Sequence, residues 1–274
     1  VYRDQGRMEE QEPIVRKNLA IKIRALGAEH NDTRSSLREM ASICLKKAEP
    51  HIEAEDWAAV LECLSPIFEL QPDVKTWRTL TALQLYQGDT AGYRQACQAA
   101  WEQFAESEKS WELAILANFC SLAPENGIDA EQLVALADEL LAAKPDSVTR
   151  LTKGVAEYRS GNCSDALATL PTKGSERVLP ISLLVRAMAH YQLGDLQAAR
   201  HQYDQALKEI DRWTPTPNTG PELNQYSPDR WILWCQYQAV LREVQSLLGP
   251  VATDLRSPDS KEPKKSTPTV DPLE

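Results

Sequence analysis

Apolar residues recur at every third or fourth position along most of this chain. Between Ile181 and Ala206 two such stretches meet at a tight turn around Gly194. This spacing is typical of amphipathic α-helices. Small residues at Ala187 and Ala199 allow two helices to approach closely. The pattern therefore predicts a pair of antiparallel helices joined at Gly194.

Glycines at predicted turns recur at a regular interval along the chain. Gly88 and Gly161 are 73 residues apart, and Gly161 and Gly194 are 33 apart. These intervals equal about two repeats and one repeat of a 34-residue helix-turn-helix unit. The small residue, the glycine turn and the following Ala-x3-Tyr-x2-Ala spacing resemble the tetratricopeptide repeat (TPR). We therefore expect an all-α fold, an α-solenoid of antiparallel TPR-like helix pairs with about twelve helices.

Proline content and the spacing of apolar residues divide the chain into four segments. Residues 1–212 are interpreted as TPR-like helical repeats that start inside a repeat, and Pro50 is expected to kink or end a helix. Four prolines in residues 213–228 predict a Pro-rich connection. Residues 229–249 carry an apolar stripe and predict a helix that caps the solenoid. Residues 250–274 lack aromatics and are expected to be a disordered tail.

Two segments resemble particular TPR types. Residues 6–32, GRMEEQEPIVRKNLAIKIRALGAEHND, are similar to the kinesin-light-chain type, although Gln11 and Asn18 stand where that type usually has alanine. That type commonly has two asparagines that hold a peptide backbone. Here Arg38 and Glu39 replace them, so that chemistry does not carry over.

From Tyr93 onward the chain resembles the C-terminal TPR region of planctomycete-type bacterial proteins, many of which carry a serine/threonine kinase domain upstream. Its most specific piece is the pair GVAEYRSG and RAMAHYQLGDLQAAR. The resemblance implies a regulatory or scaffolding segment of a larger bacterial signalling protein.

Charge and composition narrow the partners. The net charge of −10 argues against a nucleic-acid binder, whose affinity depends on clustered Lys and Arg. No run of 18 apolar residues and no export signal are present, so we expect no membrane insertion and a cytoplasmic location. The six cysteines never form C-x2-C and have no histidine at ligand spacing. We expect buried thiols in a reducing compartment, without metal or cofactor.

No catalytic motif is visible. The glycines never fall as G-x-G-x-x-G, and neither a P-loop nor the kinase loops are present. The chain is therefore not expected to be an enzyme.

Binding of a protein or peptide remains, in the concave groove that a solenoid forms from the first helix of each pair. The predicted groove positions are Arg78, Leu85, Tyr86, Leu151, Val155, Tyr158, Arg159, Leu184, Met188, Tyr191 and Gln192. A structural spacer without a specific ligand, with the tyrosines merely packing between repeats, is the alternative. The oligomeric state is left open.

Overall fold

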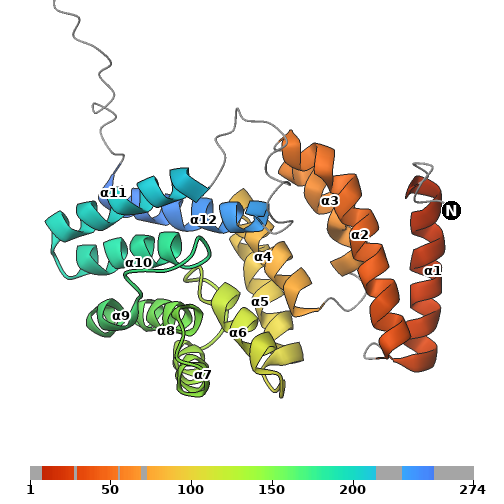
Figure 1. Ribbon diagram of the computed structural model, residues 1–274, viewed down its shortest axis with the longest axis horizontal. Helices are drawn as coiled ribbons and strands as arrows, with labels where there is room; N and C mark the ends of the chain where they lie inside the picture. The colour runs from red at the N-terminus through yellow and green to blue at the C-terminus, as the bar shows by residue number, and fades with distance from the viewer. Residues whose placement is uncertain (1–7, 28–29, 55, 69–72, 214–229, 250–274) are drawn as a thin grey trace, which may run out of the picture.

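The protein is a stack of α-helices. The computed structural model describes residues 8–27, 30–54, 56–68, 73–213 and 230–249, and every regular element in these residues is an α-helix. The helices are α1 (Met8–Leu26), α2 (Asn31–Glu53), α3 (Trp57–Phe68), α4 (Val74–Gln87), α5 (Thr90–Phe104), α6 (Ser110–Cys120), α7 (Ala130–Ala143), α8 (Ser147–Arg159), α9 (Cys163–Thr169), α10 (Leu179–Gln192), α11 (Leu196–Trp213) and α12 (Arg230–Leu248) (Figure 1). The predicted all-α, TPR-like solenoid is confirmed.

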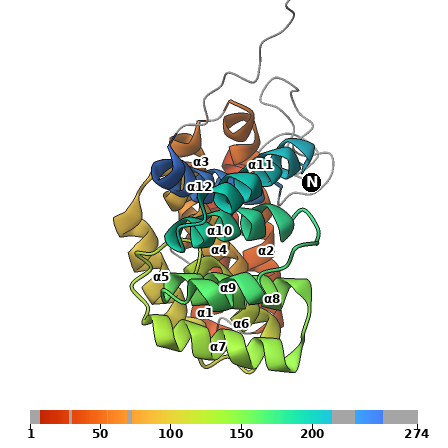
Figure 2. The ribbon, with the colours of Figure 1, turned by 90° about the vertical axis from the view of Figure 1, so that its left-hand side faces the viewer.

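Four consecutive helix pairs form the body of the solenoid. They are α4/α5, α6/α7, α8/α9 and α10/α11, and neighbouring pairs touch through their first helices. We call α4, α6, α8 and α10 the inner layer. Figure 2 shows the α10/α11 pair above α8 and α9, with α7 below them. On the other side, α1, α2 and α3 pack in sequence onto α4.

Glycine turns set the register between the two helices of a pair. Gly88 and Gly161 follow α4 and α8 with φ of +77° and +86°, a left-handed conformation that glycine adopts without steric cost. After Gly88, the Asp89 N–H donates to the Gln84 carbonyl at 2.8 Å, which closes a Schellman turn. The same bond follows Gly161 and also Gly194, so the glycines spaced in the sequence are structurally equivalent.

Small residues lie where the paired helices approach. Ala187, Ala199 and Ala206 are fully buried between α10, α11 and their neighbours. In the α8/α9 pair, a Cβ added to Gly154 would lie 2.5 Å from Cγ of Leu170. The small positions identified in the sequence are thus packing positions.

Pro50 does not end its helix. Pro50 was expected to kink or end its helix, yet α2 continues through it to Glu53. Because Pro50 lies in the last turn, the missing N–H removes only one main-chain hydrogen bond, and the helix ends three residues later.

Helix α12 takes a position that the sequence did not predict. We expected residues 229–249 to cap the last helix pair, but α12 crosses the inner layer and packs along α4 and α10, with slight contact to α11 (Figure 1). The reason is that the N-terminal part of α12, residues 231–237, is buried on nearly all sides, whereas its C-terminal part is amphipathic. Its buried residues are Trp231, Ile232, Leu233, Cys235, Gln236, Tyr237, Val240, Leu241 and Val244. The predicted connection, apart from residue 213, and the predicted tail lie outside the described residues.

Candidate functional site

The first two turns of α12 enter an aromatic cluster on α3 and α4. Trp57 of α3 stacks on Trp234 at 5.5 Å and on Trp231 at 6.2 Å between ring centroids. Tyr86 of α4 lies 4.9 Å from Trp234 and meets Trp57 edge-on at 5.2 Å. Such offset and edge-on pairs are worth about 0.5–1.5 kcal/mol each beyond their buried area. This cluster anchors the N-terminal part of α12.

Arg242 anchors α12 to the end of α4. Its guanidinium donates to the carbonyl of Leu85 at 3.1 Å and to that of Tyr86, and it lies 5.2 Å from the centre of the Tyr86 ring. Both carbonyls belong to the last turn of α4, where main-chain acceptors have no donor four residues ahead in the helix; the Leu85 carbonyl also accepts a hydrogen bond from the Gly88 N–H at 3.1 Å. The negative end of the helix dipole also favours a cation there. Arg242 therefore supplies both hydrogen-bond donors and a positive charge to the C-terminal end of α4.

A second charged contact joins α12 to α8. The Arg159 guanidinium forms a two-point ion pair with Glu243, with one N–O distance of 2.8 Å. It also donates to the carbonyls of Ser121, at 3.1 Å, and Leu122. The Arg159 side chain is only 6% exposed, whereas that of Glu243 is 25% exposed. Glu243 thus neutralises a cation that is buried in the inner layer.

Tyr158 lies beside this ion pair. Its ring is 5.3 Å from the Arg159 guanidinium, a distance typical of a cation–π contact. Burial, together with the negative charge of Glu243, raises the pKa of Tyr158 to about 12. Gln192 of α10 lies beside Tyr158 at the same pocket and offsets part of this rise in pKa. Tyr158 is thus neutral at physiological pH and held between α8, α10 and α12.

A pocket opens next to Tyr158. It has a volume of about 670 Å³ and lies between the C-terminal ends of α8 and α10, the start of α9, and α12. Its lining residues are Pro124, Tyr158, Arg159, Gly161, Asn162, Cys163, Ser164, Asp165, Gln192, Leu193 and Glu243. Leu193 is 52% exposed at the rim. The volume falls within the range of about 300–1,000 Å³ found for ligand sites in proteins.

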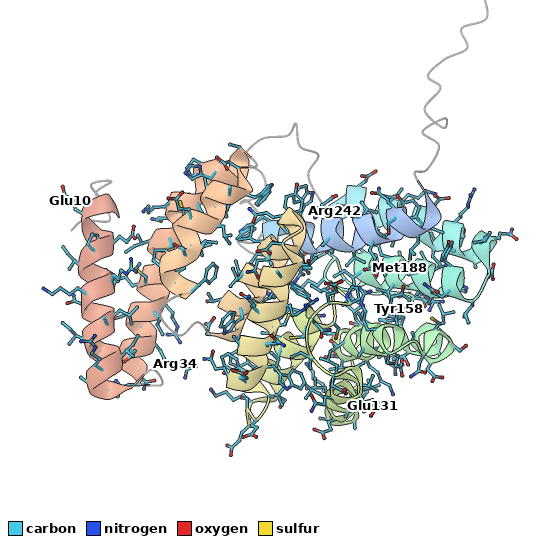
Figure 3. The ribbon with its side chains drawn as sticks, turned by 180° about the vertical axis from the view of Figure 1, so that it is seen from behind. Glu10, Arg34, Glu131, Tyr158, Met188 and Arg242 are labelled. Atoms are coloured by element: carbon cyan, nitrogen blue, oxygen red, sulfur yellow. The ribbon has the colours of Figure 1, made fainter. Side chains whose placement is uncertain are left out.

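The predicted groove residues divide into three groups. Five are core residues here, because the inner layer and α12 cover them: Leu85, Leu151, Val155, Leu184 and Met188. Tyr158, Arg159 and Gln192 come together at the pocket. Figure 3 shows Tyr158 of α8 and Met188 of α10 below Arg242 of α12. Binding of a partner by the five core residues stays a prediction that requires α12 to leave.

The three remaining predicted residues lie outside the pocket. Arg78 and Tyr86 are half-buried on α4, and Tyr86 contacts α12. Tyr191 is half-buried on α10 and does not line the pocket.

Sequence reasoning missed the residues that fill the groove. Trp231, Trp234, Arg242 and Glu243 belong to the segment that was expected to be a cap, and Trp57 of α3, on which the two tryptophans stack, was not singled out. One signal was available, because residues 231–237, WILWCQY, are apolar on more than one helix face. A helix of that kind is buried between two layers instead of covering one end.

Cysteine, histidine and carboxylate side chains also lie elsewhere in the described residues. No group of three or more His, Cys, Asp or Glu side chains there is arranged to hold a metal ion. All six cysteines are free thiols, and four of them are buried. Burial raises the pKa of the Cys44 thiol to about 12. No described helix is long and apolar enough to span a bilayer.

Comparison with known proteins gives one match. Residues 1–32 match the family model of the tetratricopeptide repeat. No curated protein and no solved structure shows significant similarity to the chain. The match lies at the first helices of a stack in which pairs repeat as antiparallel units with equivalent glycine turns. Together, the match and the helical architecture support a tetratricopeptide-repeat protein.

Proposed function

We propose that this chain is a non-catalytic interaction module that binds an extended protein segment at the pocket between α8, α9, α10 and α12. TPR repeats are generally protein–protein interaction modules, which supports a protein partner. The observation that carries the proposal is the pocket itself, where Tyr158 and Gln192 remain accessible although α12 packs along α4 and α10.

The chemistry of the pocket favours a basic or neutral segment. The cation of Arg159 is already matched by Glu243, so it does not attract a second anion. Asp165 and the exposed part of Glu243 add negative charge to the rim. A lysine or arginine of the partner would find these carboxylates and the Tyr158 ring within one pocket. The net charge of −10 would steer such a partner toward the protein.

Two broader roles fit the same architecture. The resemblance of the region from Tyr93 onward supports a regulatory C-terminal region of a cytoplasmic bacterial serine/threonine kinase, with the catalytic domain upstream. A structural spacer is favoured by a different observation, namely that α12 packs on α4 and α10 of the inner layer. The interaction module requires the pocket to select a partner, whereas these two roles do not.

The test blocks the pocket without touching the core. Ser164 is exposed on α9 and lines the pocket, so Ser164→Trp places an indole in it. Gln132→Trp on the exposed face of α7 is the matched control. The full chain and both variants serve as bait, and bound proteins are cross-linked and identified by mass spectrometry. We expect specific partners to be lost with Ser164→Trp and kept with Gln132→Trp. Partners kept by both variants would refute the pocket as the binding site.

A further inference from the structure

Helix α12 packs on α4 and α10, two helices that lie far apart in the sequence. It follows α11 after a segment of 16 residues, 214–229, and returns to α4, so Arg242 contacts a carbonyl 157 positions earlier in the chain. Its 19 residues span about 28 Å at 1.5 Å per residue, enough to cross from α4 to α10. Helix α12 thus packs on the first and last helices of the inner layer, α4 and α10, and reaches α8 through the Arg159–Glu243 ion pair.

We propose that the inner layer is a receptor for an amphipathic helix, that α12 is its intramolecular occupant, and that a partner protein binds by displacing α12 with a helix of the same chemistry. That chemistry is a Trp-x-x-Trp pair followed, eight and nine residues after the second tryptophan, by arginine and glutamate. The proposal rests on the proposed interaction function and names a partner class and a second surface for it.

The receptor side supplies groups that any such helix can use. The Leu85 and Tyr86 carbonyls are end groups of α4 that accept the Arg242 guanidinium, that of Leu85 in addition to the Gly88 N–H. The buried Arg159 needs a carboxylate opposite it. Trp57 and Tyr86 present aromatic faces to two tryptophan rings. These positions lie on three different helices, so they select a helix by the spacing of its side chains.

The fit of α12 is incomplete at two places. The side-chain Nε2 of Gln236 on α12 and the indole Nε1 of Trp57 are buried, and neither has a hydrogen-bond partner among the described residues. An unsatisfied buried donor weakens an association. A tethered helix tolerates such defects because its effective concentration reaches the millimolar range. A partner helix with an apolar residue at the position of Gln236 would not carry that defect.

The experiment makes α12 exchangeable in the full chain. A recognition sequence for a site-specific protease is inserted between Thr219 and Gly220, and the protein is studied uncut and cut. The probe is a fluorescent synthetic peptide of residues 229–249, and its uptake is followed by fluorescence anisotropy. We expect the cut protein to exchange its α12 for the probe and to stay helical by circular dichroism. The uncut protein should bind the probe at least about tenfold more weakly, because its own α12 competes in cis.

Variant peptides test the stated chemistry. A Glu243→Lys peptide places a cation against Arg159 and should bind about 30-fold more weakly or worse. A Ser246→Lys peptide makes a change to lysine on the exposed side and should bind within about threefold of the probe. A peptide that keeps the buried residues of α12 together with Arg242 and Glu243, and has alanine at the exposed positions, should displace the probe. Its failure to compete would overturn the partner chemistry.

Two further results would overturn the receptor assignment. One is a cut protein that loses its helicity, because α12 would then be an indispensable part of the core. The other is a helical cut protein that takes up all peptides equally or takes up none. Both are distinguishable from failure of the proposed pocket, which is tested by Ser164→Trp in the uncut chain and leaves α12 unchanged.

Discussion

The ion pair between Arg159 and Glu243 offers a direct measure of how firmly α12 is held. Replacing Glu243 with glutamine keeps the side-chain shape and one oxygen acceptor but removes the negative charge. The guanidinium of Arg159, only 6% exposed, then keeps the carbonyls of Ser121 and Leu122 but loses its counter-ion. The substitution should therefore destabilise the docked position of α12.

The magnitude follows from the burial of the two partners. Removing one partner of a fully buried ion pair costs about 3–5 kcal/mol. The Glu243 side chain is 25% exposed and therefore partly hydrated, and glutamine retains a hydrogen bond. A loss of about 1.5–3 kcal/mol, the range for hydrogen bonds to charged groups, is expected instead. For a urea m-value of about 3 kcal/mol/M, this lowers the unfolding midpoint by about 0.5–1 M.

The assay combines urea unfolding, followed by circular dichroism, with hydrogen exchange of the α12 amides. Exchange in α12 should accelerate more than exchange in α7. Glu139→Gln on the exposed face of α7 is the control and should change the free energy of unfolding by less than about 0.5 kcal/mol. In an Arg159→Met background, Glu243→Gln should cost much less, because the two effects are coupled. A Glu243→Gln protein as stable as the control, with unchanged exchange in α12, would refute the reasoning.

Two other predictions concern α8. Gly154→Ala should lower the free energy of unfolding by about 1–2 kcal/mol, because the added Cβ would lie 2.5 Å from Leu170. This cost outweighs the helix propensity of alanine, which favours the helix by about 1 kcal/mol. Urea unfolding measures the change, and an unchanged cost in a Leu170→Ala background would contradict the clash. Tyr158 has a pKa of about 12 in the folded protein against about 10 in the unfolded chain, so the folded state favours the protonated phenol. Its stabilising contribution is complete below pH 10 and is lost as the pH rises toward 12. Tyr158→Phe should therefore lose less stability than the native chain between pH 9 and pH 11, and equal losses would exclude this ionisation as a cause.

Much of the helical framework can be predicted because its determinants are local. The apolar period decides which residues form a helix, and the glycine turns decide where it ends. Asp73 and Asp146 begin α4 and α8 by accepting hydrogen bonds from main-chain N–H groups two or three residues ahead. Each signal acts within about one helical turn, so Gly88 and Gly161 locate their turns without reference to the rest of the chain.

The candidate site was only partly predictable. Tyr158, Arg159 and Gln192 were identified from their positions in the repeat, and the structure places all three at one pocket. The sequence pattern did not show that Arg159 is neutralised from within the chain. Glu243, the partner of Arg159, is 84 residues away in the sequence. It belongs to α12, for which the local sequence pattern predicts burial but not a contact with α8.

The number and direction of the helices are therefore properties of the sequence, while the state of the groove is a property of the tertiary structure. Helical periodicity, capping aspartates and left-handed glycines act over a few residues and need no distant partner. The path of α12 depends on contacts with α4, α8 and α10, which lie up to 157 positions away and are brought together only when the repeats stack. That stacking brings the apolar side of α12, together with Arg242 and Glu243, onto the inner layer.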